Sequence, residues 1–289
     1  MDSVKVTSKI VGGAQNRAIS SIAGVGLGFR QEHFPLISQQ LPKIPWFEIL
    51  TENFIQQSIS QRKTLDFLRA HYPIALHGVS LSIGSTDPIN FTYLRALKAL
   101  ITRYEPCWVS DHLSWVSLAD HYVPDLLPLP FTHESLQHII SRIHRVQDYL
   151  QRPILLENIS AYIQFEASSI PEWEFLELLC KATRCFLVLD INNIYVNAKN
   201  HTLCVKDFLN KITPSYVQEF HLAGFEENNT LLIDTHGAPI HTEVWELYTF
   251  ALQRFGNKPT LIEWDTNIPE FSVLDQERRK AEILQCQNV

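Results

Sequence analysis

Short apolar runs that end in charged or amide residues recur along this chain of 289 residues. The clearest run is Phe186–Asn193, in which apolar side chains follow one another without alternation until Asp190, with Asn192 and Asn193 close behind. An unbroken apolar run of this length predicts a strand that is buried on both faces of a parallel sheet. The polar residues then lie where that strand emerges from the sheet.

The same pattern predicts eight short strands, at Ile22–Phe29, Trp46–Leu50, Ile74–Leu76, Cys107–Val109, Ile154–Leu156, Phe186–Asn193, Tyr216–Phe220 and Pro259–Ile262. Segments with helical spacing of apolar residues separate the strands. We expect these helices at Arg30–Gln40, Ile59–His71, Asn90–Tyr104, Glu134–Leu150, Glu172–Ala182, Val205–Ile212, Thr242–Phe255 and Val273–Leu284. Of two further connections, Leu113–Thr132 is expected to be an active-site loop and Asn228–Gly237 a hairpin or loop.

Regular alternation of strands and helices over about 250 residues favours a single (β/α)8 barrel of the TIM type. A doubly wound open sheet is the main alternative, but a barrel alone directs the carboxyl ends of all its strands to one spot. The glycines of Gly24–Gly28 lack the spacing of a dinucleotide-binding fingerprint. We therefore expect an N-terminal extension over residues 1–21 and one catalytic barrel domain over residues 22–289.

Composition narrows the expected partners and location. The net charge of -7 argues against a nucleic-acid partner, and no apolar run approaches the roughly 20 residues that span a membrane. Residues 1–21 lack the apolar core of a signal peptide. Five cysteines without a Cys-x-x-Cys pair are typical of reduced thiols, so we expect a cytoplasmic protein.

Residues that can bind metals follow nearly every predicted strand. The candidates are Glu52, His77, Asp111, His112, Glu157, Asn158, Asp190, Asn193, His221, Asp234, His236 and Glu263. Clustered carboxylates raise one another's pKa unless cations compensate. Imidazole and carboxylate donors without thiolate suit iron, manganese or zinc, and their number exceeds the three protein ligands of a catalytic zinc. The set therefore predicts a site with two or three metal ions.

Some of these candidates have a structural alternative. His77 could be a hydrogen-bonded core histidine. Asp111 could orient the neighbouring His112 or cap a helix. Asp190 and Asn193 could likewise cap the helix that follows rather than bind metal. Metal binding is nevertheless favoured for His77 and His112, because so many potential ligands accompany them.

For the remaining candidates the sequence context favours metal binding more directly. Glu157 and Glu263 end buried apolar runs, where a carboxylate is costly unless it is paired or bound to a metal. Asp234 and His236 are two residues apart, so both side chains reach the same side of an extended segment. His221 follows the apolar end of another predicted strand.

Eight short motifs, taken in order, resemble the multinuclear non-haem iron-dependent oxidative enzymes, a family that includes the catalytic subunit of the methanobactin-biosynthesis oxidase. The motifs are LTEN at 50–53, LHG at 76–78, SDHLSW at 110–115, LLEN at 155–158, LDINN at 189–193, EFHLAG at 219–224, DTHG at 234–237 and LIEWD at 261–265. One such motif would be weak, but eight in the same order make the resemblance specific.

This resemblance implies a barrel related to xylose isomerase and endonuclease IV, with two or three iron ions (Fe2+/Fe3+) at its mouth and O2 as co-substrate. It implies metal ligation by His77, His112, Glu157, Asn193, His221, Asp234, His236 and Glu263, with Asp190 as a further ligand or an orienting residue. Among these, we expect His112, Glu157, Asp190 and Glu263 to be catalytic. Members oxidise cysteine residues of ribosomally synthesised peptides, and many work with a partner protein that recognises the peptide leader.

We therefore expect a multinuclear iron-dependent oxidase of RiPP biosynthesis that uses O2 to modify cysteines of a precursor peptide. The first alternative is a divalent-metal isomerase, epimerase or phosphodiesterase on the same barrel, which would need Mn, Mg or Zn and no oxygen. The second alternative is a non-catalytic metal- or peptide-binding protein, whose metal coordination would be saturated.

Overall fold

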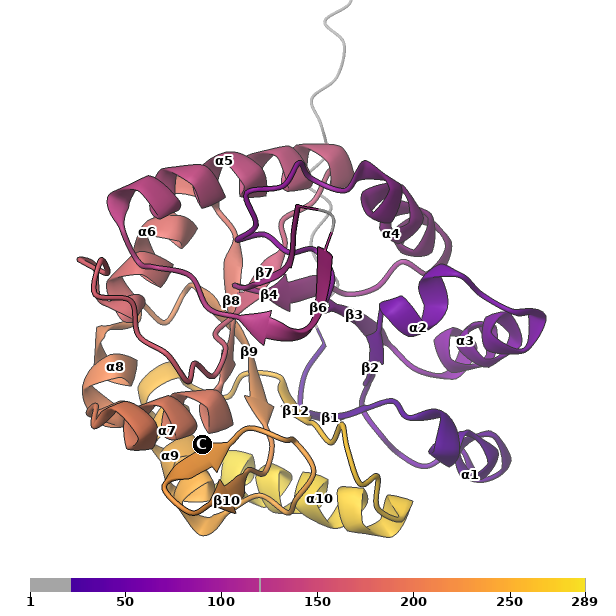
Figure 1. The fold of residues 1–289 in the computed structure, drawn as a ribbon. Coiled ribbons are helices and arrows are strands. Elements are labelled where there is room, and N and C mark those ends of the chain that lie inside the picture. Colours follow the sequence, from indigo (N-terminus) through magenta and orange to yellow (C-terminus); the bar gives the residue numbers. More distant parts are fainter. Residues whose placement is uncertain (1–21, 120, 289) are drawn as a thin grey trace, which may run out of the picture.

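Eight parallel strands close into a barrel in the computed structural model, which describes residues 22–119 and 121–288. Around the barrel, the strands are β1 (Val25–Gly28), β2 (Phe47–Leu50), β3 (Ile74–Gly78), β4 (Val109–His112), β7 (Leu155–Glu157), β8 (Phe186–Asp190), β9 (Val217–Leu222) and β12 (Thr260–Ile262). Parallel pairing of β12 with β1 completes the ring, at the centre of Figure 1. The predicted (β/α)8 barrel is confirmed.

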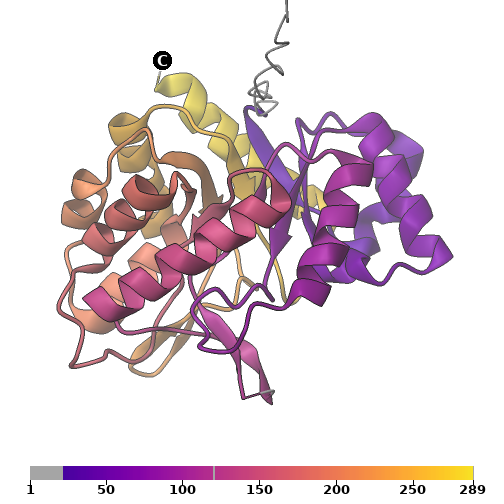
Figure 2. The ribbon, with the colours of Figure 1, turned by 90° about the horizontal axis from the view of Figure 1, so that it is seen from above.

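Helices surround this barrel (Figures 1 and 2). They are η1 (Gln31–His33, a 3-10 helix), α1 (Phe34–Gln40), α2 (Glu52–Ile55), α3 (Ile59–His71), α4 (Phe91–Tyr104), α5 (His133–Leu150), α6 (Glu172–Thr183), α7 (Ile191–His201), α8 (Val205–Lys211), α9 (Thr242–Phe255) and α10 (Phe271–Gln287). Their apolar faces and the outward-pointing strand residues form the main hydrophobic core. No helix in the described part of the chain is long and apolar enough to cross a membrane.

Two antiparallel hairpins follow the carboxyl ends of barrel strands. One pairs β5 (Trp115–Leu118) with β6 (His121–Leu127), and the other pairs β10 (Glu226–Asn228) with β11 (Leu231–Ile233). Figure 2 shows the β5–β6 hairpin projecting beyond the helices, at the end of the molecule away from the C-terminus. The two long connections expected from the sequence therefore contain hairpins.

Apolar side chains fill the part of the barrel interior that is nearest the amino ends of the strands, which we call the lower part. Trp46 is completely buried and packs edge-on against Trp108, with ring centroids 5.9 Å apart. Gly26 on β1 provides the space for it, because a Cβ atom there would lie 2.4 Å from the Trp46 ring. Since side chains two residues apart on a strand share a face, Glu48 follows Trp46 into the barrel interior. The interior therefore changes from apolar to polar toward the carboxyl ends of the strands.

One predicted strand is too long, and two helices, the short α2 and the longer α7, were not predicted. The strand predicted at Phe186–Asn193 ends at Asp190, whose Oδ1 accepts a hydrogen bond from the backbone N–H of Asn193 at 2.6 Å and so begins α7. The first eight residues of α7, 191–198, are all buried. A helix buried on every side lacks an amphipathic stripe, so its sequence reads as a continuation of the strand. Most other predicted elements differ from the structure only at their ends.

The close approach of β1 to Trp46 gives a first prediction. Gly26→Ala should lower the free energy of unfolding by about 1–3 kcal/mol, because the added methyl group forces the buried ring to move. Denaturant unfolding of both proteins measures the change. Gly28→Ala is the control, since a Cβ there would meet first the flexible end of Arg30, at 3.2 Å. Equal losses for the two variants would contradict the packing argument.

Candidate metal centre

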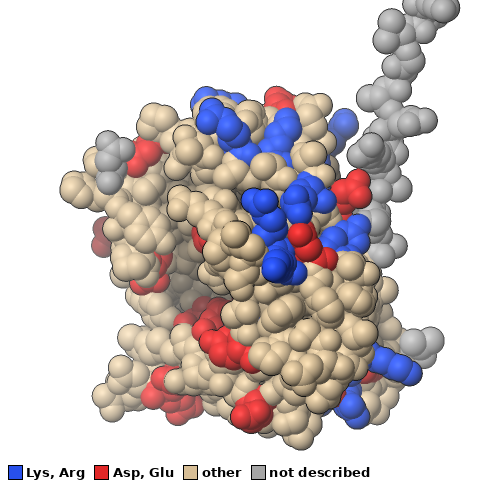
Figure 3. All heavy atoms as spheres, turned by 90° about the vertical axis from the view of Figure 1, so that its right-hand side faces the viewer, with Lys and Arg blue, Asp and Glu red and all other residues tan. Residues whose placement is uncertain are grey.

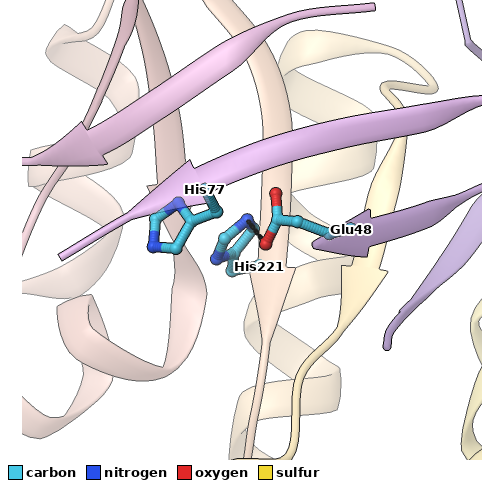
Figure 4. Close-up of side chains that lie close together, drawn as sticks. All are labelled: Glu48, His77 and His221. Carbon is cyan, nitrogen blue, oxygen red and sulfur yellow. Dashed lines mark ion pairs between the residues drawn. The ribbon is translucent and has the colours of Figure 1, made fainter. Parts of the chain in front are cut away.

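Imidazoles and carboxylates from six strands and two connections gather at the mouth of the barrel. They are Glu48 on β2, His77 on β3, His112 on β4, Glu157 on β7, Asp190 on β8, Glu219 and His221 on β9, and Asp234, His236 and Glu263 in connections. Figure 4 shows three of them, from β2, β3 and β9, reaching into the space between their strands. Among the described residues, no Lys or Arg forms an ion pair with any of the ten.

Three donor atoms form a compact triangle. Nε2 of His77 lies 3.3 Å from Nε2 of His112 and 3.3 Å from Oε2 of Glu157, and the third side, from His112 to Glu157, is 3.5 Å. Donors about 2.1 Å from one tetrahedral ion would be about 3.4 Å apart. The triangle therefore has the dimensions of three ligands to a single ion.

The protons of the two imidazoles are on the far side of each ring. Nδ1 of His112 donates to the carbonyl of Gly78 at 3.1 Å. The Ser110 hydroxyl donates to the Leu76 carbonyl and accepts from Nδ1 of His77 at 2.8 Å. Burial lowers the pKa of His77 to about 3, so that ring is neutral. With Nδ1 of each ring bonded on the far side, Nε2 of both rings and a carboxylate oxygen face one another, and a cation between them would be stabilised by these three donors.

Within the residues described, three further groups of donors adjoin this triangle and share ligands with one another. They are Glu48, His77 and His221; Glu157, Asp190, His221 and Glu263; and His236, Glu263 and Asp265. Donor atoms of Glu157, Asp190, His221 and Glu263 lie within 4.8 Å of one another. Nδ1 of His221 is 3.1 Å from Oε2 of Glu263, and Nδ1 of His236 is 3.3 Å from the same oxygen. His77, Glu157, His221 and Glu263 each belong to two of the four groups. Shared carboxylates suit adjacent ions that they bridge, so the geometry fits a multinuclear site.

Asp190 and Asn193 keep one oxygen each for the site. Oδ1 of Asp190 caps α7, but its Oδ2 has no hydrogen-bond partner and lies 3.6 Å from Nε2 of His236. The amide of Asn193 donates to the Asn158 carbonyl at 3.1 Å, which leaves Oδ1 buried without a partner. Both oxygens of Glu157 are also without one. Buried polar atoms are rarely left unpaired, so these fit metal ligation.

Asp234 is held in position by neighbours from other elements. Its Oδ2 accepts from the Ser160 hydroxyl and its Oδ1 from the Asn192 amide, both at 2.8 Å. Nε2 of His236 lies 2.7 Å from Oδ1. Asp234 and His236, which the Asp-Thr-His motif predicts as a pair, are therefore in contact, and hydrogen bonds from Ser160 and Asn192 fix the carboxylate of Asp234.

The electrostatics follow from many charges in a space with little water. Burial alone would raise the pKa of Glu157, but the neighbouring imidazoles, chiefly those of His112 and His221, lower it to about 2. Burial alone would lower the pKa of His221, but neighbouring carboxylates raise it well above its ordinary value. Burial raises the pKa of Glu48 to about 8. The metal-free site therefore retains protons that a bound cation would displace.

Two acids of this cluster, Glu48 and Glu219, were not among the sequence candidates. Their Oε1 atoms lie 3.7 and 3.6 Å from Nε2 of His221, on the side of the ring away from Glu157. Both lie inside apolar runs rather than at their ends. One signal could have identified them. A carboxylate within a buried strand is costly unless it has a partner, and side chains two residues apart face the same side, so each acid was expected to point into the barrel.

Two sequence candidates, Glu52 and Asp111, lie outside the metal-binding groups. Glu52 begins α2 instead of extending from β2, and its Oε1 accepts from the Tyr93 hydroxyl at 2.9 Å. Asp111 points away from the mouth and accepts from the backbone N–H groups of Leu81 and His112, at 3.1 and 2.8 Å. Asp111 therefore bonds to the backbone around His112 and Leu81, while the ring of His112 is oriented by the Gly78 carbonyl.

Asn158 is also structural. Its amide donates to the Asp190 carbonyl at 3.1 Å, and its Oδ1 accepts from the Asp190 N–H at 3.0 Å. This two-way bond joins the ends of β7 and β8, and so fixes the distance between two neighbouring ligands.

A cavity of about 430 Å³ lies over the candidate ligands. Its floor includes His77, His112 and Glu157, and its walls include Tyr162 and Asp125, the latter from the predicted active-site loop. Figure 3 shows a hollow with acidic side chains along its border, whereas most Lys and Arg side chains of this face gather away from it. The cavity is therefore an acidic chamber with metal-type ligands at its base.

The chain is similar in sequence to a defined enzyme family. The family model described as RiPP precursor modification enzyme MbnB/TglH/ChrH matches residues 24–286. A UPF0276 protein of Acaryochloris marina is 49% identical over 271 residues, which cover 94% of this chain and 98% of that protein. A UPF0276 protein of Vibrio parahaemolyticus is 45% identical and covers 91% of this chain and 93% of its own length. The family resemblance predicted from the motifs is confirmed.

Solved structures share the fold at low identity. A xylose isomerase-like TIM barrel protein from Mycobacterium smegmatis, in complex with magnesium, has a TM-score of 0.60 at 9% identity and covers 92% of this chain and 97% of its own. Endonuclease IV from Thermus thermophilus has a TM-score of 0.59 at 12% identity and covers 92% of this chain and 100% of its own. The expected relation to these two barrel types is confirmed at the level of the fold.

The raised pKa of Glu48 predicts how the stability of the metal-free protein depends on pH. In the folded protein the carboxyl group of Glu48 keeps its proton up to pH about 8, whereas in the unfolded chain it loses the proton near pH 4.5. The stabilisation is therefore fully present below pH 4.5 and is lost as the pH rises from 4.5 to about 8. The raised pKa values of His221 and His236 act in the same direction. We expect a lower free energy of urea unfolding at pH 8 than at pH 5, with chelator present.

Glu48→Gln should reduce this decrease, because the amide cannot ionise. The matched control is Glu246→Gln at an exposed position of α9, which should leave the pH dependence unchanged. A metal-free wild-type protein that is as stable at pH 8 as at pH 5 would contradict the assignment.

Proposed function

Because this chain belongs to the MbnB/TglH/ChrH family of RiPP precursor modification enzymes, we propose that it is an iron-dependent oxidase that uses O2 to modify cysteine residues of a ribosomally synthesised peptide. The observation that carries the proposal is the triangle of His77, His112 and Glu157, in which two imidazole nitrogens and a carboxylate oxygen lie 3.3–3.5 Å apart. Imidazole and carboxylate donors without thiolate suit iron.

The proposed ligands fall into three neighbouring groups. The first two are His77, His112 and Glu157, and Glu157, Asp190, His221 and Glu263. The third takes His236 and Glu263 from the group that they form with Asp265, and adds Asn193 and Asp234, which also line the cavity. Bound iron would supply the activation of O2 and the electron transfer that no side chain of the protein can provide. The protein contributes a fixed donor geometry and a chamber of limited size.

Each part of the chamber has a separate task in this proposal. His112, Glu157 and Glu263 line the cavity, so a substrate thiol that enters meets these ligands first. Asp190 lies beneath them, fully buried. Arg30 on the cavity wall donates to the Trp264 carbonyl at 2.8 Å and pairs with Asp265, so it leaves the charge of the ligand carboxylates for the metals. We propose His112, Glu157, Asp190 and Glu263 as the catalytic ligands.

The substrate in this proposal is a cysteine-containing precursor peptide, and a separate partner protein recognises its leader. Two observations fit a peptide: the cavity of about 430 Å³ is open to solvent, and Asp125 and Leu126 of the β5–β6 hairpin line it. The proposal keeps the cytoplasmic location expected from the cysteine pattern.

Oxygen dependence separates this function from its alternative. The iron-loaded protein is incubated under air and under nitrogen with a cysteine-containing peptide encoded beside its gene, together with any co-encoded partner. We expect a mass change on cysteine under air only, detected by mass spectrometry. Turnover under nitrogen with Mn or Zn would instead support an isomerase-type enzyme and overturn the oxidase.

His112→Ala should lose iron and activity, whereas His144→Ala at an exposed position of α5 should keep both.

The hydrogen bond between Ser110 and Nδ1 of His77 predicts an effect on metal affinity. Ser110→Ala removes the hydroxyl that accepts from Nδ1 of His77, so affinity for the metal in the first group should fall by about 10–100-fold. Competition with a chelator measures this change independently of turnover. Ser60→Ala, at an exposed position of α3, is the matched control. Unchanged affinity in Ser110→Ala would show that the ring needs no such support.

A further inference from the structure

A second cavity lies next to the metal chamber, which we name the side pocket. Its volume is about 590 Å³. It is lined by the segment between β7 and α6, at the left of Figure 1, and by parts of α7 and α8. We propose that the side pocket binds an apolar side chain of the peptide substrate, a few residues from the cysteine at the metal centre. This inference rests on the proposed function and adds a specificity site to it.

The wall between the two cavities is a single extended segment. Ile159 lines both cavities. After it, Ser160 and Tyr162 line the metal chamber, whereas Ala161 and Ile163 line the side pocket. Alternate side chains of an extended chain point to opposite sides, so one backbone segment serves both cavities. A peptide over this wall would therefore contact both.

Hydrogen bonds fix this wall from both sides. On the side of α7, Oδ1 of Asn197 accepts from the Ala161 N–H at 2.7 Å, and its amide donates to the Ile159 carbonyl at 2.8 Å. On the metal side, the Tyr162 hydroxyl accepts from the Asp234 N–H at 2.9 Å. The side pocket is therefore preformed, which lowers the entropy cost of binding, and its wall is bonded directly to a proposed ligand.

The side pocket exposes apolar side chains that would be covered by a bound one. Ile163 is 57% exposed and Leu203 is 55% exposed, and both line the pocket. Its interior also includes Phe208 and Trp173. Apolar surface collected in a concave site, rather than scattered singly, is typical of a binding site. The charged residues Glu172, Asp207 and Lys211 also line the pocket, so the apolar part of its surface is the part that Ile163, Leu203, Phe208 and Trp173 form.

The position of the pocket identifies the occupant as the substrate rather than a separate molecule. Leu113, which lines the pocket, directly follows the candidate ligand His112, and Asn158 and Ile159 directly follow Glu157. An extended peptide advances about 3.4 Å per residue. A peptide whose cysteine reaches the metals therefore brings side chains only a few residues away to the side pocket.

Selection from peptide libraries tests the inference without requiring turnover. The iron-loaded full-length protein is used under nitrogen to select from two display libraries, with four random residues on each side of a fixed cysteine or of a fixed serine. We expect the cysteine library to be enriched in large aliphatic or aromatic residues at one constant distance from the cysteine. Burial of one such side chain corresponds to about 10–100-fold in affinity.

Two variants alter the pocket in different ways. Ala161→Trp fills it, and Leu203→Ser removes an exposed part of its apolar lining, which places little demand on folding. Both should abolish the positional preference while cysteine-dependent capture remains. Ala70→Trp, at an exposed position of α3, is the matched control and should retain the preference.

The outcomes separate this inference from the proposed function. Cysteine-dependent capture without a preferred apolar position, or a preference that survives both variants, would overturn the side pocket and leave the oxidase intact. Equal capture from both libraries, with an apolar preference that the variants abolish, would support the pocket and remove the cysteine from the proposal. No enrichment from either library would overturn the inference.

Discussion

Repulsion between buried carboxylates is the constraint on which the rest of this structure depends. Glu157 and Glu263 are ionised in a space with little water, and the described part of the chain offers them no lysine or arginine as an ion-pair partner. Imidazoles alone compensate them in the metal-free protein, by retaining protons. Burying these carboxylates so close together is unfavourable unless cations bind between them, because a charge removed from water is stabilised only by opposite charges nearby. The donor set is therefore better suited to holding metals than to stabilising the empty barrel.

The barrel satisfies this constraint by separating its interior into two layers. Apolar side chains such as Trp46 and Trp108 fill the lower layer, so the polar layer is closed to water from that end. Hydrogen bonds from neighbouring strands then orient the ligands: the Gly78 carbonyl fixes the ring of His112, and Asn158 joins β7 to β8. Supporting groups of this kind are as important to a metal site as the ligands themselves.

The connections beyond the strands have a different task. The segment after β7 forms one wall of the metal chamber with Ser160 and Tyr162 and one wall of the side pocket with Ala161 and Ile163. In barrels of this type the strands fix the reacting centre while the loops at their carboxyl ends determine what can reach it. The residues that bind metal and the residues that select the substrate are therefore close in the chain but belong to different segments. The loops can change to accept another substrate while the metal ligands on the strands stay the same.

Local signals in the sequence were sufficient for much of the fold and for the residue types of the site. Helix α3 has the predicted bounds because Ser58 and Gln61 form a capping box at its start, and α9 ends at Phe255 because Gly256 follows it. Likewise, the nine residues predicted as ligands were chosen because each ends an apolar run or adjoins another donor, and they lie together at the mouth of the barrel. These features depend on a few neighbouring residues, which the sequence displays directly.

Only the tertiary structure decided how distant residues combine. Closure of the barrel brings Glu48 beside His221, a contact that no spacing along the chain reveals. The helix α7 escaped prediction because it is buried on every side, and its burial is a property of its neighbours rather than of its own sequence. The side pocket has the same origin, since its walls come from segments that are separate in the chain. Periodicity reports which way a side chain points, whereas what it meets there is determined by the register and closure of the strands.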